Sequence, residues 1–200
     1  MRMNGELIAR DAEAVRVSLE VVSRVRAADL GRPTPCAAWT LRDLLAHMTA
    51  QHEGFAAAAR GEGGAEVWRP RADASDPVGA YEAAAGRVLA AFAELGVLGR
   101  PFLLPEIDPE RPVPGVRAVG FHLVDYVVHA WDVARSLGGG VEFGAEVLDA
   151  ALAVARKVPE GDARTAPGAA FAPGVAYSSA GGTALGEILA RLGRDPGRDL

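Results

Sequence analysis

The residues best suited to chemistry lie in one stretch, FHLVDYVVHAWDVARSL, residues 121–137. Read as a helix, this stretch is apolar around most of its circumference, which is typical of a helix buried on several sides. One stripe of it nevertheless carries His122, Asp125, Tyr126 and His129. Because buried charges are normally paired or bound to a metal, the stripe predicts a polar site inside a helical core.

Asp125 and His129 form the most suggestive pair. They are four residues apart, so their side chains leave consecutive helical turns and can reach one ion. The alternative is a polar pair that hydrogen bonds satisfy inside the core, without a metal. His122 lies one turn earlier and could be a fourth ligand or an outer partner, but it is more typical of a core residue that only borders the site.

The helix predicted near residues 40–60 adds His47 and His52. His52 lies on the apolar stripe of that helix and His47 lies beside it, so periodicity favours His52 as the more buried histidine. A histidine beside an apolar face is more often a hydrogen-bonded structural residue than a ligand. If His47 is a ligand, two histidines and one carboxylate leave an open coordination position, as catalytic zinc sites do, and the same set also suits iron or nickel.

Composition excludes several classes of protein. The formal net charge is −5 and no basic cluster is present, which argues against a nucleic-acid partner. No apolar run approaches the roughly 20 residues of a membrane span, and the N-terminus lacks the apolar core of a signal peptide, so we expect a cytoplasmic protein without a membrane partner. The single cysteine, Cys36, excludes an internal disulfide and a cysteine-rich zinc site; it precedes a helix start, and an inert thiol there is more usual than a reactive one.

The chain is expected to be all-α. Apolar periodicity and turn residues predict helices near residues 6–29, 40–60, 76–95, 121–137, 144–157 and 183–192. Thr40 with Asp43 resembles a capping box, and Asp76 before Pro77 is a second helix start. Residues 97–114 hold five prolines and are expected to form a long irregular crossover. We therefore predict a bundle with a short fifth helix over residues 1–158, and a tail over 159–200 packed on it.

Four motifs together resemble a known family: TPCAAWTLRDLLAHM, FAAAARG, HLVDYVVHAWDVARSLG and LARLGRDP. They are similar to those of an actinobacterial group of metal-binding proteins related to the N-terminal domain of mycothiol-dependent maleylpyruvate isomerase. The resemblance covers the chain from about Asp11 to Pro196. It implies a DinB-like four-helix bundle with a long crossover before the fourth helix and a short C-terminal helical tail.

The resemblance also implies a ligand set. The family's metal-binding histidine in the second helix matches His47 rather than His52, and its acidic residue and histidine in the fourth helix match Asp125 and His129. His122, Tyr126 and Arg135, on the same helix, are expected as substrate contacts or outer partners of the metal.

The chain departs from the isomerase in two respects. It carries Asp125 where the isomerase has glutamate, so the carboxylate is one methylene closer to the backbone. The isomerase also has a distinct C-terminal domain that helps form its active site, whereas only a short tail follows the fourth helix here. We therefore expect the metal bundle and the use of a thiol to carry over, rather than maleylpyruvate isomerisation itself.

The expected function is that of an enzyme. A divalent metal, zinc before nickel or iron, would bind a small thiol such as mycothiol and deprotonate it for transfer to, or isomerisation of, a small electrophilic substrate. The alternative is a metal- or small-molecule-binding module without catalysis, and a third reading is a metal-free helical bundle. The chain is expected to be a monomer or a homodimer.

Overall fold

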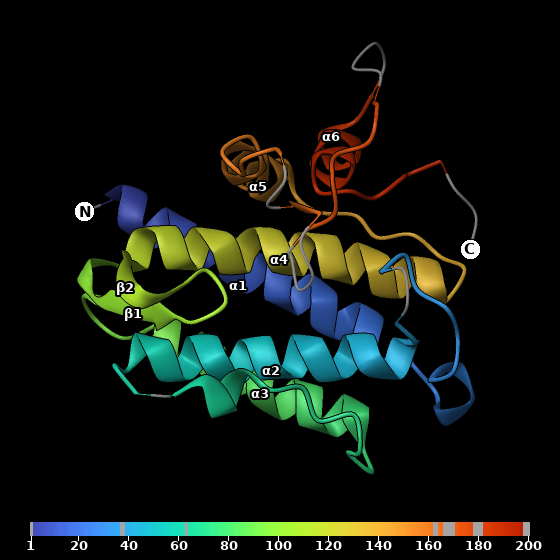
Figure 1. The fold of residues 1–200 in the computed structure, drawn as a ribbon, viewed down its shortest axis with the longest axis horizontal. Helices are drawn as coiled ribbons and strands as arrows, with labels where there is room; N and C mark the ends of the chain where they lie inside the picture. The colour runs from blue at the N-terminus through green and yellow to red at the C-terminus, as the bar shows by residue number, and fades with distance from the viewer. Residues whose placement is uncertain are drawn as a thin grey trace.

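Four helices that follow one another in the chain form the core of the computed structural model: α1 (Arg2–Val22), α2 (Leu41–Ala59), α3 (Pro77–Phe92) and α4 (Gly115–Ser136). The structure describes residues 2–36, 39–62, 64–161, 164–165, 171–177 and 182–197. Helix α1 packs mainly along α4, and α2 packs mainly along α3 (Figure 1). This arrangement confirms the predicted bundle of helices.

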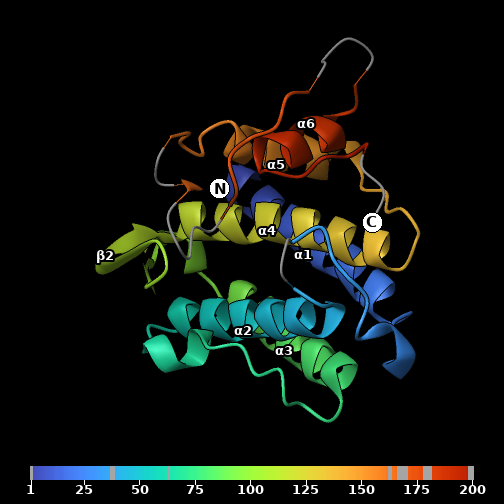
Figure 2. The same ribbon diagram turned by 45° about the vertical axis from the view of Figure 1, so that its right-hand side comes forward.

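Helix α4 is buried from two sides. Helices α5 (Ala145–Ala155) and α6 (Ala184–Arg191) lie on the side of α4 that faces away from α2 and α3 (Figures 1 and 2). Leu123 and Val127 of α4 belong to an apolar cluster with Ile188 of α6, whereas Tyr126 and Val133 belong to a cluster with α1 and α2. The apolar circumference of α4 is therefore matched by neighbours around most of the helix.

Caps fix where the helices that carry the site begin. The Thr40 side chain accepts a hydrogen bond from the backbone N–H of Asp43, and the Asp43 carboxylate accepts one from the backbone N–H of Thr40 at 3.0 Å. The predicted capping box is therefore present, and it sets the phase at which α2 presents His47. Asp76 likewise caps α3, with Pro77 at the first helical position.

Helix α4 begins earlier than periodicity predicted, at Gly115 rather than near Phe121. Its end agrees with the prediction: Gly138 has a φ of +75°, a left-handed conformation that glycine adopts without strain. The backbone N–H of Gly139 then donates to the carbonyl of Ala134 at 2.9 Å, which closes the last turn. The whole site stripe consequently lies inside one uninterrupted helix.

The fold is mainly helical, as predicted, but the prediction that residues 97–114 are irregular was wrong. Strands β1 (Pro101–Leu104) and β2 (Asp108–Pro114) form an antiparallel hairpin in which Phe102 pairs with Val113. Phe102 and Leu104 point into the core, whereas their neighbours are exposed. Both strands of a two-stranded sheet are edge strands, where proline is tolerated.

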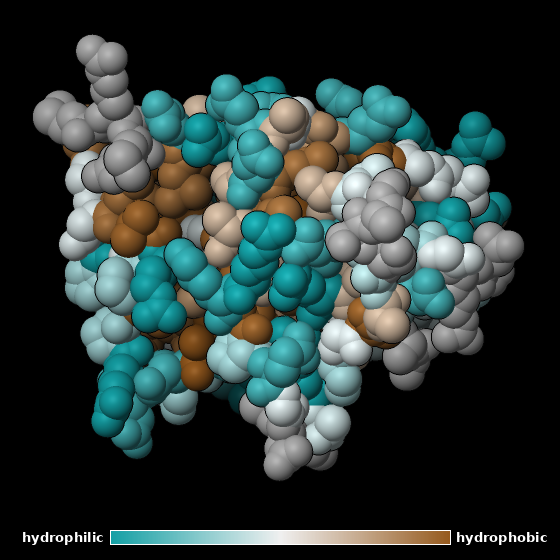
Figure 3. Space-filling model, turned by 90° about the horizontal axis from the view of Figure 1, so that it is seen from above, coloured by the Kyte–Doolittle hydropathy of each residue, from teal (hydrophilic) through white to brown (hydrophobic). Residues whose placement is uncertain are grey.

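The C-terminal segment packs on the bundle through α5 and α6. The Thr183 side chain caps α6, and the backbone N–H of Val175 donates to the carbonyl of Ala190 at 2.9 Å. On the face of the molecule that carries α5 and α6, hydrophobic patches alternate with hydrophilic side chains (Figure 3). The predicted boundary between a bundle over residues 1–158 and a tail over residues 159–200 stays a prediction.

Among the described residues, no helix combines the length and hydropathy needed to cross a membrane.

Candidate metal centre

The structure brings together the three residues that the sequence pointed to as ligands. His47 comes from α2, and Asp125 and His129 come from α4; one ligand atom of each lies within 4.8 Å of the others. Nε2 of His129 lies 3.4 Å from Oδ1 of Asp125. The His47 and His129 rings meet edge to face, with their centroids 5.2 Å apart. Two imidazoles and one carboxylate therefore converge on a single point.

The chemical state of these groups fits a divalent metal. Oδ2 of Asp125 is buried and has no hydrogen-bond partner in the described part of the chain. Burial, followed by the charge on His129, lowers the pKa of His47 to about 4, so its imidazole is neutral at neutral pH and keeps a free lone pair. A neutral imidazole and an unpartnered carboxylate oxygen are what a zinc ion requires of its ligands.

Asp132 orients His129, and the sequence analysis did not identify it. Nδ1 of His129 lies 2.9 Å from Oδ2 of Asp132, while Nε2 faces Asp125. The N–H of a metal-binding histidine commonly donates to a carboxylate in this way, which fixes the ring and its tautomer. Burial opposes the charge on Asp132, but Arg194 and His129 outweigh it and lower its pKa to about 2. The signal that could have found Asp132 is its spacing of three residues from His129 on one helix.

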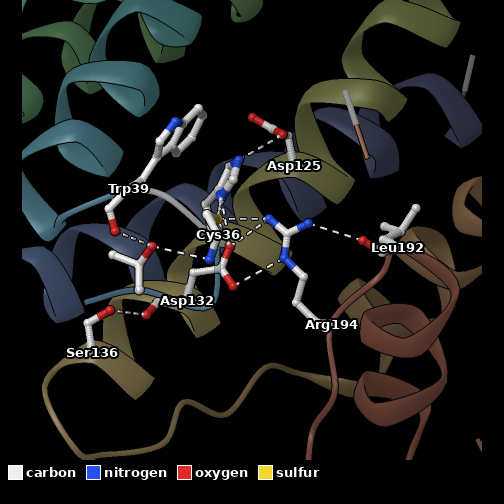
Figure 4. A network of polar contacts seen from close by, with 9 residues as sticks. Cys36, Trp39, Asp125, Asp132, Ser136, Leu192 and Arg194 are labelled. Atoms are coloured by element: carbon white, nitrogen blue, oxygen red, sulfur yellow. Dashed lines mark hydrogen bonds and ion pairs between the residues drawn. The ribbon is translucent and has the colours of Figure 1, made fainter. Parts of the chain in front are cut away.

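Arg194 reaches this carboxylate from beyond α6. Its Nη2 donates to Oδ2 of Asp132 at 2.9 Å and its Nε to Oδ1 at 3.3 Å (Figure 4). Nη2 also lies 3.0 Å from Sγ of Cys36, and the Cys36 thiol lies 3.1 Å from Oδ2 of Asp132. Cys36, His129 and Asp132 have the composition of a second metal cluster. The buried guanidinium of Arg194 contacts two of its members, so an ion-pair network borders the candidate centre formed by His47, Asp125 and His129.

The neighbours of His129 favour its protonated form. Burial alone would lower its pKa, but Asp125, Asp132 and Cys36 together raise that pKa well above its usual value. Against burial, His129 and His47 hold the pKa of Asp125 below its ordinary value. A metal ion bound by His129 would compete with protons for its imidazole, so metal binding would weaken as the pH falls.

His122 belongs to a separate buried chain of polar groups. Its Nδ1 lies 2.7 Å from Oδ1 of Asp11, and its Nε2 lies 3.1 Å from Nδ1 of His52. All three residues are fully buried. Periodicity was therefore right that His52 is more buried than His47, yet His52 directs a nitrogen at His122 rather than into the metal cluster.

The other two expected contacts lie in different surroundings. Tyr126 is fully buried, donates its hydroxyl to the Met48 carbonyl and stacks on His52 with ring centroids 3.8 Å apart. The guanidinium of Arg135 lies over the Trp131 ring, 5.9 Å from its centroid. Neither belongs to the cluster of ligand atoms, and their roles toward a substrate stay predictions.

Further polar and aromatic groups border the centre. The Trp39 and His47 rings lie 4.8 Å apart, and Trp39 is partly exposed. Nε2 of Gln51, one turn along α2 from His47, donates to Oε2 of Glu106 in the hairpin turn at 2.8 Å. Burial raises the pKa of Glu106, and the charge on Asp125 adds to this effect. The hairpin that the sequence did not predict therefore brings a carboxyl group toward the site.

Comparisons with known proteins agree with this architecture. The family model for the mycothiol maleylpyruvate isomerase N-terminal domain matches residues 12–134. An uncharacterized protein of Mycobacterium tuberculosis, found in two strains, is 34% identical over 152 residues, which are 76% of this chain and 78% of that protein. The predicted resemblance is thereby confirmed.

Solved structures extend the comparison to the fold. The crystal structure of the mycothiol-dependent maleylpyruvate isomerase matches with a TM-score of 0.58 at 16% identity, covering 76% of this chain and 67% of that one. A histidine-to-alanine mutant of the same enzyme gives the same values. At this level of identity the likeness shows a shared fold.

Proposed function

The chain belongs to the family of the mycothiol maleylpyruvate isomerase N-terminal domain, and we propose that it is a metal-dependent enzyme that activates a small thiol. The observation that carries the proposal is the convergence of His47, Asp125 and His129 around a buried carboxylate oxygen that lacks a partner. His47, Asp125 and His129 would hold the metal, and three protein ligands would leave a coordination position for the thiol.

The chain's own residues would keep this centre in order. Asp132 would hold His129 with Nε2 directed at the metal, and Arg194 would keep Asp132 ionised. The bound metal would supply one effect, deprotonation of the thiol at neutral pH. Two nitrogens and one oxygen suit zinc, which we propose as the metal; nickel and iron accept similar ligands.

The reaction we propose is thiol-linked transfer to, or isomerisation of, a small electrophilic substrate. Support for the thiol comes from the family, whose named enzyme is dependent on mycothiol. A binding module without catalysis would share the metal but would not need the thiol, so thiol binding separates the two functions.

The first experiment measures metal content by elemental mass spectrometry, on protein purified without a nickel column. We expect about one zinc per chain in the wild type and none in His47→Ala or His129→Ala. His52→Ala is the matched control, because His52 lies on the same helix but outside the cluster, and it should keep its metal. Absence of metal from wild type, with no uptake of added zinc, contradicts the proposal.

The second experiment tests the thiol. The protein is loaded with cobalt in place of zinc, and mycothiol is added while the absorption spectrum is recorded. Direct binding of the thiolate should produce a sulfur-to-cobalt charge-transfer band in the wild type and in His52→Ala. A metal-loaded protein without that band would be a metal-binding module rather than a thiol-dependent enzyme.

A further inference from the structure

A cavity of about 410 Å³ lies between α2, α3 and the loop that joins them, away from the metal centre. Leu45, Thr49 and Glu53 of α2 line it. These residues lie one turn apart on a face of α2 that points away from His47, because two residues along a helix correspond to a turn of about 200°. Most of the α2 side chains that line the cavity therefore point away from His47, whereas Ala50, three residues from His47, lies on the flank of the helix between the two sites.

The outer wall of the cavity is fixed to the bundle. It includes the short 3₁₀ helix η2 (Ala65–Trp68), whose Trp68 is buried against Phe55. The Trp68 ring fits closely against Gly54: a Cβ there would lie 2.3 Å from Cδ2 of the indole. Further along the loop, Nη1 of Arg42 donates to the carbonyls of Ala72 and Ala74 at 3.3 and 3.1 Å. The cavity is therefore held open by specific contacts at both ends of its wall.

The lining combines apolar walls with an excess of positive charge. Ala46, Val67 and Ala80 are among the apolar side chains. Four arginines also line the cavity, and carboxylates pair with two of them: Glu53 accepts from Nε of Arg87 at 2.9 and 3.0 Å, and Glu66 lies 2.9 Å from Arg69.

The other two arginines, Arg42 and Arg71, form no ion pair with a described carboxylate, so their charges can act on a bound anion. Arg42 donates to backbone carbonyls, which carry no net charge, while the neighbouring Asp43 carboxylate is bound to Thr40. Arg71 is exposed and forms no ion pair with a described residue. Hydrogen bonds from Thr40 and, to a smaller extent, the charge on Arg42 lower the pKa of Asp43. Neither Arg42 nor Arg71 forms an ion pair with a described carboxylate, however, so the cavity has an excess of positive charge although the formal net charge of the chain is −5. An anion would gain from both the local field and the guanidinium donors.

We propose that this cavity binds an organic anion with a compact apolar body, of the class of aromatic carboxylates. The apolar walls would take the ring, and Arg42 and Arg71 would take the acid group. A cavity of this size lies within the range of small-molecule sites, which pair apolar walls with a few polar groups. The site is independent of the metal and of the function proposed above.

The test uses 2-naphthoate as the probe and 2-naphthol as its uncharged counterpart, with isothermal titration calorimetry at neutral pH. We expect one 2-naphthoate per chain, bound several-fold more tightly than 2-naphthol. Arg71→Glu should weaken binding of 2-naphthoate by more than it weakens binding of 2-naphthol. Arg111→Glu, an exposed charge reversal on β2, is the matched control and should leave both unchanged.

A second variant, Ala80→Trp, fills the cavity from α3 and should abolish binding while leaving the metal content unchanged. If this variant does not fold, Arg71→Glu and the two ligands still decide the question, because Arg71 is exposed and its replacement disturbs no core contact. Equal binding of the two ligands, or binding that Arg71→Glu leaves unchanged, would overturn the proposal.

Discussion

His129 organises the candidate centre at the scale of single residues, because its two ring nitrogens have different partners. Nε2 faces Asp125 and His47, and Nδ1 is held by Asp132. Asp132 is itself held by Arg194, so the orientation of one imidazole depends on a chain of charged groups. Metal affinity should therefore depend on residues that do not touch the metal.

Asp132→Asn tests this dependence. The substitution keeps the size of the side chain but removes the charge that holds Nδ1–H of His129. We expect zinc affinity to fall by about 10–100-fold, with the three ligands still present. The measurement is a competition titration of zinc against a chromophoric chelator.

The matched control for that substitution is Asp149→Asn, because Asp149 is exposed on α5. It changes the net charge equally and should leave zinc affinity as in the wild type. Equal affinities in all three proteins would show that Asp132 does not position His129.

Prediction of the site from the sequence worked where spacing along one helix carries the information. Asp125 and His129 share a stripe of α4, and both face one cluster. The choice of His47 over His52 came from the family resemblance, because periodicity reports burial and not ligation. Arg194 is 62 residues from Asp132 and meets it only through packing of the tail, so no helical pattern could have predicted that pair.

At the scale of secondary-structure elements, a row of buried polar side chains joins three helices. Asp11 of α1 contacts His122 of α4, which contacts His52 of α2. Asp11→Ala would leave Nδ1 of His122 buried without its partner. We expect a loss of about 1–3 kcal/mol in the free energy of unfolding, measured with urea, and no change in zinc content.

Glu20→Ala is the control for Asp11→Ala, since Glu20 is exposed on the same helix. Loss of bound zinc in Asp11→Ala, with Glu20→Ala unaffected, would show that the polar chain supports the metal centre and is not a separate structural feature.

The buried contacts between Asp11, His122 and His52 also make the free energy of unfolding depend on pH. Burial, with the charge on His122 adding to it, holds the pKa of His52 well below 6.5. Below about pH 6.5, His52 binds a proton in the unfolded state but stays neutral in the native state. The contribution of His52 to stability is therefore fully present above that pH and is lost as the pH falls below it. His52→Gln should lessen the loss of stability between about pH 7.5 and 5.5, measured by urea unfolding of metal-free protein.

A residual pH dependence is expected in His52→Gln, because the pKa of His47 is also lowered, to about 4. The quantity to compare is therefore the slope of the free energy of unfolding against pH in the wild type and in His52→Gln. If the wild type and His52→Gln lost the same stability over this range, His52 would not be the buried neutral group that the geometry indicates.

Caps and periodicity predicted the helices well because both are local. Thr40 and Asp43 bond to each other's backbone, so their spacing alone marks the start of α2. The hairpin was missed because its prolines are typical of irregular chain, and its stability comes from Phe102 and Leu104 packing on distant helices. Antiparallel pairing that depends on tertiary contacts is not encoded in local sequence.

At the scale of the whole molecule, the C-terminal segment reaches the candidate metal centre. The family model ends at residue 134, but Arg194 lies beside Asp132 and is 7% exposed. Cys36, which precedes α2, contacts the same guanidinium. Residues from opposite ends of the chain are therefore joined at one carboxylate, so folding of the tail and organisation of the site should be coupled.

Arg194→Met tests the coupling. It leaves Asp132 buried without its cation, and we expect a loss of about 3–5 kcal/mol in the free energy of unfolding together with weaker zinc binding. Arg191→Met is the matched control, because Arg191 lies on α6 and pairs only with the partly exposed Glu187 in the described contacts. Urea unfolding with and without zinc separates the two effects, since bound metal stabilises the native state in proportion to its affinity. A variant that is destabilised but keeps wild-type zinc affinity would assign Arg194 to the packing of the tail alone. Loss of both would make the tail part of the metal centre.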